Sequence, residues 1–417
     1  MNPLRSVARR LAELELWAVS ALALVSLLDP RWLLPCVLMA GCFWLLRWVG
    51  DGRLTVRTGG DLGVLLLMAA LPLNLWLTGF QAISLQQAYR LLSGVALYYA
   101  LVNWANSPAR LRLATLGLMV VGVGVAAYSL VQSEAQARSL LAMLRSLRQF
   151  SLPLPQDVVN PNVMAGSLAL IFPLALSGAF SAWGKSSSIF QLFSGATTVF
   201  IGGAIALSLS RGAWVALVLS VLVLIFLRWR GRWLVFAVAL TAAGIIAYRV
   251  APLLMLDVLL AGTSAGDLVG RLNIWSRAII MMRDFPFTGV GLGMFQTAIS
   301  RLFPLTFSGS APANHAHNLY LQIGVDLGIP ALIAWLALLL LAFWVSAQTF
   351  AQTRRHRSRT DWFAGASAGL FCGVVALAVH GVFDAVTWGM VRPAPLVWVL
   401  WGLIMAYGNL AWRHSDR

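Results

Sequence analysis

Two histidines are the strongest candidates for chemistry in this sequence. Residues 313–318 read ANHAHN and place His315 and His317 two positions apart, in a chain with only five histidines. Histidine can accept a proton near neutral pH because its ordinary pKa lies there. A His-x-His pair can also share a metal ion, but no Asp, Glu or Cys stands near it in the sequence to complete a ligand set. The segment therefore predicts a general base and no metal site.

A carboxylate near another apolar segment is the candidate partner of this base. His380 and Asp384 are four residues apart, one helical turn, near the end of an apolar run. A lone Asp at such a place can be a solvated helix end, yet a carboxylate can also orient a histidine that takes up a proton. Asp384 is therefore a candidate catalytic residue, with His380 as a further candidate.

Several arginines occupy positions that suit an anionic ligand. Arg211 follows an apolar run directly, at a depth where an unpaired guanidinium is costly, although it could also extend to the lipid headgroups. Arg271 and Trp275 are four residues apart and share one face of a predicted helix over 268–282. Arg90 is a further candidate, since it falls on the same side of the membrane in the topology below.

The elements that must position these residues are transmembrane helices. Apolar residues make up 60% of the 417 positions and charged residues 11%, against roughly 25% charged residues in an ordinary soluble domain. The pattern predicts an all-α polytopic membrane protein, with 1–417 as a single membrane domain and about 12 transmembrane helices. We expect these helices over 13–28, 32–49, 62–79, 87–104, 112–131, 162–183, 189–208, 213–228, 233–249, 328–347, 362–383 and 393–412.

The basic residues predict the orientation. Most of the 30 Lys and Arg residues lie in short loops on the side of the N-terminus, which the positive-inside rule makes cytoplasmic. Two long connections then face outward. The first, 132–160, predicts an interfacial helix on the outer leaflet, and the second, 250–327, is a large external loop between the ninth and tenth helices that carries catalytic motifs. The net charge of +16 forms no stripe, so nucleic-acid binding is not expected.

Two further patterns have ordinary interpretations. The chain has 18 tryptophans, and we assign nearly all of them to the membrane interfaces, where this residue collects. The glycines of 289–293 lack the spacing of a dinucleotide site and predict a flexible loop near the membrane surface.

The motifs together resemble a known superfamily. His317-Asn318, nine residues and then Gly328 resemble the signature of the bacterial O-antigen ligase and polymerase superfamily, which also includes bacterial O-oligosaccharyltransferases. The resemblance spans roughly 160–384. Its other parts are Asn160-Pro-Asn162 with Ala165-Gly166, Ser210-Arg211-Gly212, Gly270-Arg271 with Trp275, and Pro286 with Gly289, Gly291 and Gly293. Ala331 stands where the oligosaccharyltransferase signature has Gly, Thr or Tyr, which argues against protein glycosylation.

The resemblance implies a bacterial inner-membrane glycosyltransferase with its site facing the periplasm. It would move a glycan from a polyprenyl (undecaprenyl) pyrophosphate to an acceptor sugar hydroxyl, that of lipid A core in a ligase. Arg211 and Arg271 would bind the pyrophosphate. His317 would take the acceptor proton with Asp384 holding its ring, and no cofactor or metal would be needed.

Three alternatives stay open. The chain could be a polysaccharide polymerase, whose acceptor is a second carrier-linked glycan. An anion transporter would use the same arginines, but it is expected to show an internal repeat and ionisable residues at the bilayer midplane, and neither is found in the sequence. A purely structural scaffold would leave the second long external loop unexplained.

Overall fold

A computed structural model describes residues 3–132, 161–181, 188–208, 210–228, 268–305, 313–355, 361–385, 387–389 and 392–412. Within these ranges every regular element is a helix. The N-terminal half contributes α1 (Pro3–Ala12), α2 (Glu15–Leu28), η1 (Pro30–Trp32), α3 (Leu33–Asp51), α4 (Asp61–Leu77), α5 (Gln81–Trp104), α6 (Pro108–Gln132), α8 (Pro161–Ala179) and α9 (Ser188–Leu207). The remainder contributes α10 (Arg211–Arg228), α12 (Leu268–Asp284), α13 (Phe295–Arg301), α14 (Leu319–Arg355), α15 (Asp361–Phe383) and α16 (Leu396–Trp412).

Eight of the helices in these ranges are long and apolar enough to cross a membrane. They are Pro3–Leu28, Pro30–Asp51, Pro108–Leu130, Asn162–Ala179, Ser188–Leu207, Arg211–Arg228, Leu319–Arg354 and Trp362–Phe383. Asp61–Leu77 and Leu396–Trp412 are shorter apolar helices. The protein is therefore a polytopic helical membrane protein. The expected helices over 132–160 and 233–249 lie outside the described residues.

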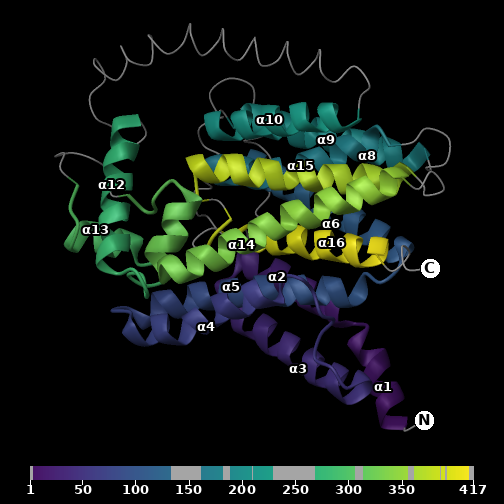
Figure 1. The fold of residues 1–417 in the computed structure, drawn as a ribbon, viewed down its shortest axis with the longest axis horizontal. Coiled ribbons are helices and arrows are strands. Elements are labelled where there is room, and N and C mark those ends of the chain that lie inside the picture. The colour runs from purple at the N-terminus through teal and green to yellow at the C-terminus, as the bar shows by residue number, and fades with distance from the viewer. Residues whose placement is uncertain are drawn as a thin grey trace, which may run out of the picture.

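The helices form one bundle with a distinct end (Figure 1). α14, α15 and α16 run side by side with α5 and α8, while α1 and α3 lie along one edge. α12 and α13 stand beside the beginning of α14, at the end of the bundle opposite to both termini. The predicted site residues Arg271, His315 and His317 lie on α12 or directly before α14, so they belong to this end of the bundle.

Several predicted helix boundaries were wrong, and two of them are the most informative. The helix expected over 328–347 begins nine residues earlier, at Leu319, and bends at Gly328, which has φ 84° and ψ 173°. The reason lies in close packing, because a Cβ at Gly328 would stand 2.6 Å from the backbone of Phe287. Pro330 is tolerated because it falls in the first turn after the bend. At the other end of the chain, Pro3–Ala12 is helical although no helix was expected there.

The interior contains more tryptophan than the sequence suggested. Trp335, Trp398 and Trp401 are at most 3% exposed and form a stack, with ring centroids 5.6 Å apart for Trp335 and Trp401 and 5.1 Å apart for Trp398 and Trp401. These three tryptophans therefore pack against other helices, and the assignment of most tryptophans to the membrane interfaces stays a prediction. Large rings fill the space between α14 and α16 because aromatic edge-to-face packing buries much apolar area.

Candidate functional site

Residues 313–318, which we call the histidine loop, end where α14 begins, and Asn318 lies at that junction. Its Oδ1 accepts hydrogen bonds from the backbone N–H groups of Tyr320 and Leu321, both at 3.0 Å, so it caps the helix. Its Nδ2 donates to the carbonyl of Val382 at 3.2 Å. Asn318 thus joins the start of α14 to the end of α15, and the nine residues up to Gly328 are one straight piece of helix.

His317 adopts an uncommon backbone conformation. Its φ is 47°, in the left-handed region, where a side chain costs free energy and is retained only if the surroundings fix it. Both backbone polar groups of the preceding residue, Ala316, are held. The N–H of Ala316 donates to Gln322 Oε1 at 2.7 Å, and the carbonyl of Ala316 accepts from Trp275 Nε1 at 3.0 Å. The structure thus gives Trp275 a role in positioning the loop.

The fold brings both histidines to Asp384. The distance to Asp384 Oδ1 is 3.4 Å from His315 Nδ1 and 3.5 Å from His317 Nδ1. The two imidazole centroids lie 4.1 Å apart. Asp384 is 2% exposed and sits directly after α15, so the segments 313–318 and 380–384 form one cluster. We call His315, His317 and Asp384 the His-Asp cluster.

The backbone distinguishes the two histidines. The N–H of His317 donates to His315 Nδ1 at 3.2 Å, so this nitrogen is an acceptor and carries no proton in the neutral ring. His315 cannot then also donate from Nδ1 to Asp384. Of the two histidines, only His317 can then carry a proton on Nδ1 toward the carboxylate, and in that tautomer its Nε2 is unprotonated. The 3.5 Å between His317 Nδ1 and Asp384 Oδ1 is longer than a hydrogen bond.

Burial and charge act on the cluster in opposite ways. Burial lowers the pKa of His315 to about 4, which Asp384 opposes and which His317 and Arg271 reinforce. Burial alone would raise the pKa of Asp384, but the neighbouring imidazoles of His317, His315 and His380 outweigh it and lower that pKa below its ordinary value. The carboxyl group is therefore ionised at neutral pH, while His315 is uncharged.

The cluster is not satisfied by the protein alone. Within the described ranges Asp384 Oδ2, His317 Nδ1 and His380 Nδ1 are buried and have no hydrogen-bond partner. Buried polar atoms without partners are rare in finished packing and occur at sites that act on something else. His380 lies beside the cluster on α15, pressed against α8, where a Cβ at Gly166 would stand 2.4 Å from its ring.

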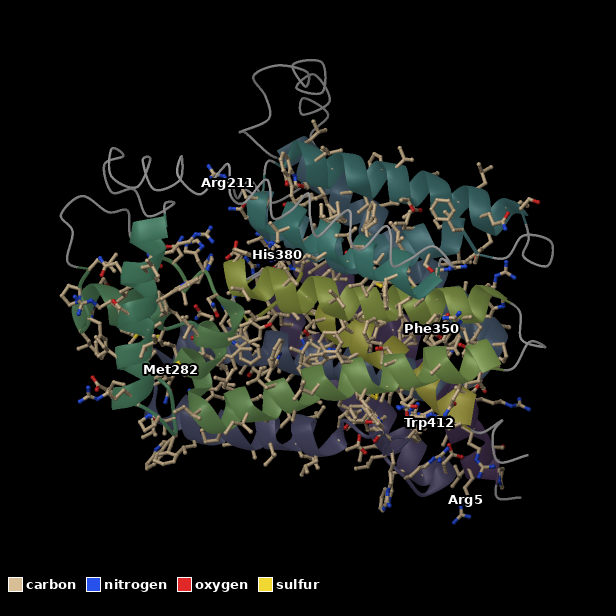
Figure 2. The ribbon with its side chains drawn as sticks, turned by 45° about the horizontal axis from the view of Figure 1, so that its top comes forward. Arg5, Arg211, Met282, Phe350, His380 and Trp412 are labelled. Carbon is tan, nitrogen blue, oxygen red and sulfur yellow. The ribbon has the colours of Figure 1, made fainter. Side chains whose placement is uncertain are left out.

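The two expected arginines approach the same point of the backbone. Arg271 donates to the carbonyl of Phe383 at 2.8 Å, directly before Asp384. Arg211 is exposed at the first position of α10. The next residue, Gly212, packs so closely on Phe383 that a Cβ would meet its side chain at 2.8 Å. Figure 2 shows Arg211 and His380 near one end of the bundle. Arg271 thus lies next to the His-Asp cluster, and Arg211 begins α10 one residue before the glycine that packs on Phe383.

Arg90 has a different place. It is 8% exposed and donates to the carbonyl of Gly389 at 2.8 Å and to Gln87 Oε1 at 3.2 Å. It therefore ties α5 to the connection that follows Asp384 and does not enter the cluster.

A second carboxylate was missed at the sequence level. Asp326 is fully buried on α14, where its oxygens accept from Gln322 Nε2 at 2.9 Å and from Trp388 Nε1 at 2.8 Å. Gln322 also accepts the N–H of Ala316, so Asp326 stabilises the histidine loop through its hydrogen bond with Gln322. An ionisable residue inside an apolar helix was the signal that could have found it.

The loop with Gly289, Gly291 and Gly293 is buried, so its interpretation as a flexible surface loop was wrong. All three glycines have positive φ. A Cβ at Gly289 would meet the backbone of Asp326 at 2.5 Å, and the N–H of Val290 donates to the carbonyl of Val325 at 2.7 Å. Only glycine permits this close approach to α14.

The donor set of the cluster could also hold a cation. One ligand atom each from His315, His317 and Asp384 lies within 4.8 Å of the others. The sequence argument excluded a metal site because no carboxylate stands near the two histidines along the chain. That argument was wrong, because Asp384, 67 positions after His317, follows α15 and lies beside them in the fold. Two imidazoles and a carboxylate are ordinary ligands of Zn²⁺.

Residues 196–336 match the model of a protein family described as O-antigen ligase. The match runs from α9 to the middle of α14 and includes Arg211, Arg271, His315 and His317, but it ends before Asp384. No curated protein matches the chain significantly.

Proposed function

We propose that this chain is a membrane glycosyltransferase of the O-antigen ligase and polymerase superfamily and, within it, an O-antigen ligase, a proposal that the match of residues 196–336 to the O-antigen ligase family model supports. It moves a glycan from polyprenyl (undecaprenyl) pyrophosphate to a hydroxyl of lipid A core, at the outer face of the bacterial inner membrane. The observation that carries this proposal is the His-Asp cluster with Arg271 beside it.

His317 is the base in this proposal. Its Nε2 takes the proton of the acceptor hydroxyl while that oxygen attacks the anomeric carbon. The bond between this carbon and the pyrophosphate oxygen breaks, and the electron pair leaves with the pyrophosphate. Attack from the face opposite the leaving group inverts the anomeric carbon. Asp384 stabilises the imidazolium that forms, and its lowered pKa keeps it ionised for this task.

Arg211 and Arg271 bind the pyrophosphate. Arginine presents a planar fork that suits two phosphate oxygens, and fixed cations stabilise the charge that develops on the leaving group. Arg211 has no hydrogen bond or ion pair within the described ranges, so its five N–H groups are available to a ligand. Two arginines can then replace the divalent ion that many phosphate-transfer sites use.

The test of this function is direct transfer. Purified protein is incubated with an undecaprenyl-pyrophosphate glycan and lipid A core, and the product is identified by mass spectrometry. Glycan-bearing lipid A core supports the ligase. Lengthened carrier-linked glycan in its place supports a polymerase, and anion flux into protein-containing liposomes without any transfer supports a transporter.

A metal-dependent reaction is the second candidate, because three ligand atoms of the cluster converge. Transfer is measured after treatment with EDTA and again with added Zn²⁺. We expect no loss with the chelator. Activity that disappears with EDTA and returns with Zn²⁺ would assign His315, His317 and Asp384 to a metal.

The proposed topology has about 12 crossings, cytoplasmic termini and two external connections, 132–160 and the second one, which begins near residue 250 and ends where α14 begins at Leu319. Single cysteines at Ser300 and Asn106, both exposed, are placed in a background without Cys36, Cys42 and Cys372. An impermeant thiol reagent added outside should label only the first position. Equal labelling would contradict the orientation.

A further inference from the structure

Arg90 of α5 is a buried cation without a counter-charge. It forms no ion pair within the described ranges. The charged residue that acts on it is Arg392, which is also positive and cannot neutralise it. The two buried carboxylates at this end of the bundle are engaged elsewhere, since Asp326 is bonded to neutral side chains and Asp384 faces two histidines. A buried charge that lacks a partner in a membrane protein is costly and indicates a ligand.

The guanidinium of Arg90 keeps N–H groups for such a ligand. Its Nη1 makes both of its hydrogen bonds, to the carbonyl of Gly389 at 2.8 Å and to Gln87 Oε1 at 3.2 Å. Its Nε and Nη2 carry the three remaining N–H groups of the side chain. Neither atom has a hydrogen-bond partner in the part of the chain that the structure describes, and neither is fully enclosed by protein. These three N–H groups are therefore open to a ligand.

Gln87 adds donors at the same place. Because its Oε1 accepts from Arg90, its Nε2 is the free end of the amide, and this atom also has no partner among the described residues and is not fully enclosed. A Cβ at Gly389 would stand 3.7 Å from Gln87 Oε1, so the three residues form one compact group. Thr387 stands two residues before Gly389, and its buried Oγ1 has no partner within the described ranges. N–H donors gathered around one cation suit the oxygens of a phosphate group.

The place of Arg90 relative to Asp384 indicates which substrate carries the phosphate. Arg271 donates to the carbonyl of Phe383, directly before Asp384, whereas Arg90 donates to the carbonyl of Gly389, five residues after it. In the bundle, α10 packs on α15 and α5 packs on α16, so α10 and α5 lie on opposite sides of these two helices (Figure 1). A reaction with inversion needs the acceptor hydroxyl to approach from the face opposite the pyrophosphate. With the pyrophosphate at Arg271, an anion at Arg90 belongs to the acceptor.

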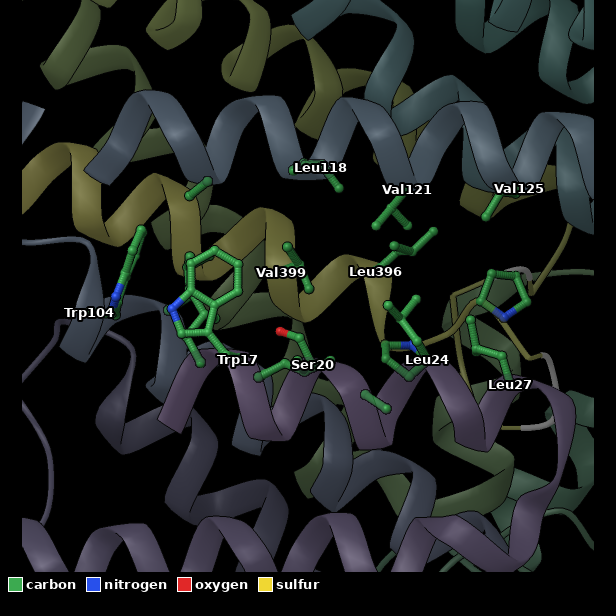
Figure 3. Close-up of a pocket in the computed structure, with 18 of the residues that line it drawn as sticks. Trp17, Ser20, Leu24, Leu27, Trp104, Leu118, Val121, Val125, Leu396 and Val399 are labelled. Atoms are coloured by element: carbon green, nitrogen blue, oxygen red, sulfur yellow. The ribbon is translucent and has the colours of Figure 1, made fainter. Parts of the chain in front are cut away.

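The apolar groove between α2, α6 and α16 is not part of this site (Figure 3). It meets α5 at Leu97, Leu101 and Trp104, further along the helix than Arg90, and none of its lining residues is charged. A phosphate would lose its hydration in such a groove without any charge in return. The N–H groups of Arg90 and Gln87 supply what the groove lacks.

We propose that Arg90 and Gln87 bind a phosphate group of the acceptor. The inference rests on the proposed function, because it defines the chemistry of the molecule whose hydroxyl receives the glycan. That molecule carries a phosphate at some distance from the reacting hydroxyl. Lipid A core and a second carrier-linked glycan both satisfy this description, so the experiment must distinguish them.

The sharpest variant for the test is Gln87→Glu. A carboxylate at this position still accepts from Arg90 Nη1 and supplies the missing negative charge, so stability should be kept while phosphate binding is lost. Gln296→Glu adds the same charge at an exposed position of α13 and is the matched control. Arg90→Gln removes the cation itself. Its control is Arg228→Gln, which removes an arginine bonded to the carbonyl of Ser177.

Binding is measured at equilibrium on protein in phosphatidylcholine nanodiscs. The ligands, each added alone, are lipid A core, lipid A core treated with phosphatase, and undecaprenyl-pyrophosphate glycan. We expect the parent protein and both controls to bind lipid A core about tenfold more tightly than its dephosphorylated form, the effect of one charge-assisted hydrogen bond. Gln87→Glu and Arg90→Gln should lose this difference and keep their affinity for the undecaprenyl-pyrophosphate glycan, which Arg271→Ala should weaken.

The undecaprenyl-pyrophosphate glycan identifies the source of the phosphate. Two classes of binding site for it, one lost in Gln87→Glu and the other in Arg271→Ala, would support the site and assign its phosphate to a carrier-linked acceptor. A single class that both variants lose would overturn the proposal, because Arg90 would then bind the donor. Equal affinity of the parent protein for both forms of lipid A core, with a single class of site for the glycan, would also overturn it. Binding is read without turnover, so a failure of transfer, which would contradict the proposed function, leaves these results unaffected.

Discussion

Asp326 and Asp384 are both buried at the same end of the bundle, yet their surroundings differ. Each oxygen of Asp326 accepts a hydrogen bond from a neutral side chain, Gln322 or Trp388. Asp384 Oδ1 accepts the N–H of Ala385 at 2.9 Å and faces two imidazoles, while Oδ2 has no partner within the described ranges.

This difference distinguishes a carboxylate that stabilises the fold from one that can act on a bound molecule. A closed network such as that of Asp326 fixes the backbone around it and leaves nothing for a substrate. An open carboxylate beside two histidines can exchange protons and charge with a bound molecule. The comparison predicts that variants around Asp384 lose activity at constant stability, and that variants around Asp326 lose stability.

The largest effect is expected for His317→Ala. Loss of the base should reduce transfer by about 10² to 10⁴, with carrier-lipid binding and thermal stability nearly unchanged. His315→Ala is the matched control and should be far milder, because the Nδ1 of His315 already accepts a backbone hydrogen bond. Turnover and melting temperature are measured on the same preparations. Normal turnover in His317→Ala together with loss in His315→Ala would exchange the two roles.

The next effect compares the carboxylates directly. Asp384→Asn removes the charge that stabilises the imidazolium and should slow transfer by about 10², less than the roughly 10⁴ of the same change in a Ser-His-Asp triad, because His317 Nδ1 lies 3.5 Å from the carboxylate. Asp326→Asn places an amide N–H against one of two donors, which should destabilise the protein by about 1 to 3 kcal/mol. Thermal unfolding and turnover of both variants test this. An equal loss of stability in Asp384→Asn and Asp326→Asn would contradict the distinction between these two carboxylates.

Arg271→Lys should have a smaller effect. Lysine keeps the positive charge and loses the fork, so transfer should fall about tenfold, while Arg271→Ala should retain very little. Arg283 lies on the same helix, is exposed and serves as the control as Arg283→Lys. The assignment of Arg271 to pyrophosphate binding is wrong if Arg271→Ala inserts normally and transfers glycan at the parental rate.

The sequence predicted the membrane helices well because apolar length is a strong local signal. The helices expected over 189–208 and 362–383 agree with α9 and α15 within two residues. The start of α14 was missed, because Asn318 as a cap and Gly328 as a bend depend on contacts with α15 and with Phe287. The local amino-acid sequence does not indicate such contacts between distant segments.

The candidate site was predicted in its parts and not in its arrangement. Residue types and spacing named the histidines, Asp384 and the arginines separately. Their convergence depends on how α10, α12, α14 and α15 pack, as does the tautomer of His317, which follows from one backbone hydrogen bond. The hydrogen bond between Asp326 and Trp388 could not be predicted for the same reason, since the two residues are 62 positions apart.

The smallest effect concerns pH and is assigned to His315 by substitution. The pKa of this buried side chain is lowered from 6.5 to about 4, so the unfolded protein binds more protons than the folded protein between these values. Its contribution to stability is therefore present above pH 6.5 and is lost as the pH falls toward 4. Asp384 adds to the loss only below its ordinary pKa of 3.8, since its pKa is also lowered. The melting temperature should fall by a few degrees between pH 7.5 and pH 5.0. His315→Gln, whose amide oxygen can still accept the N–H of His317, should show a smaller fall. An unchanged slope in this variant would mean that His315 is not the group that titrates.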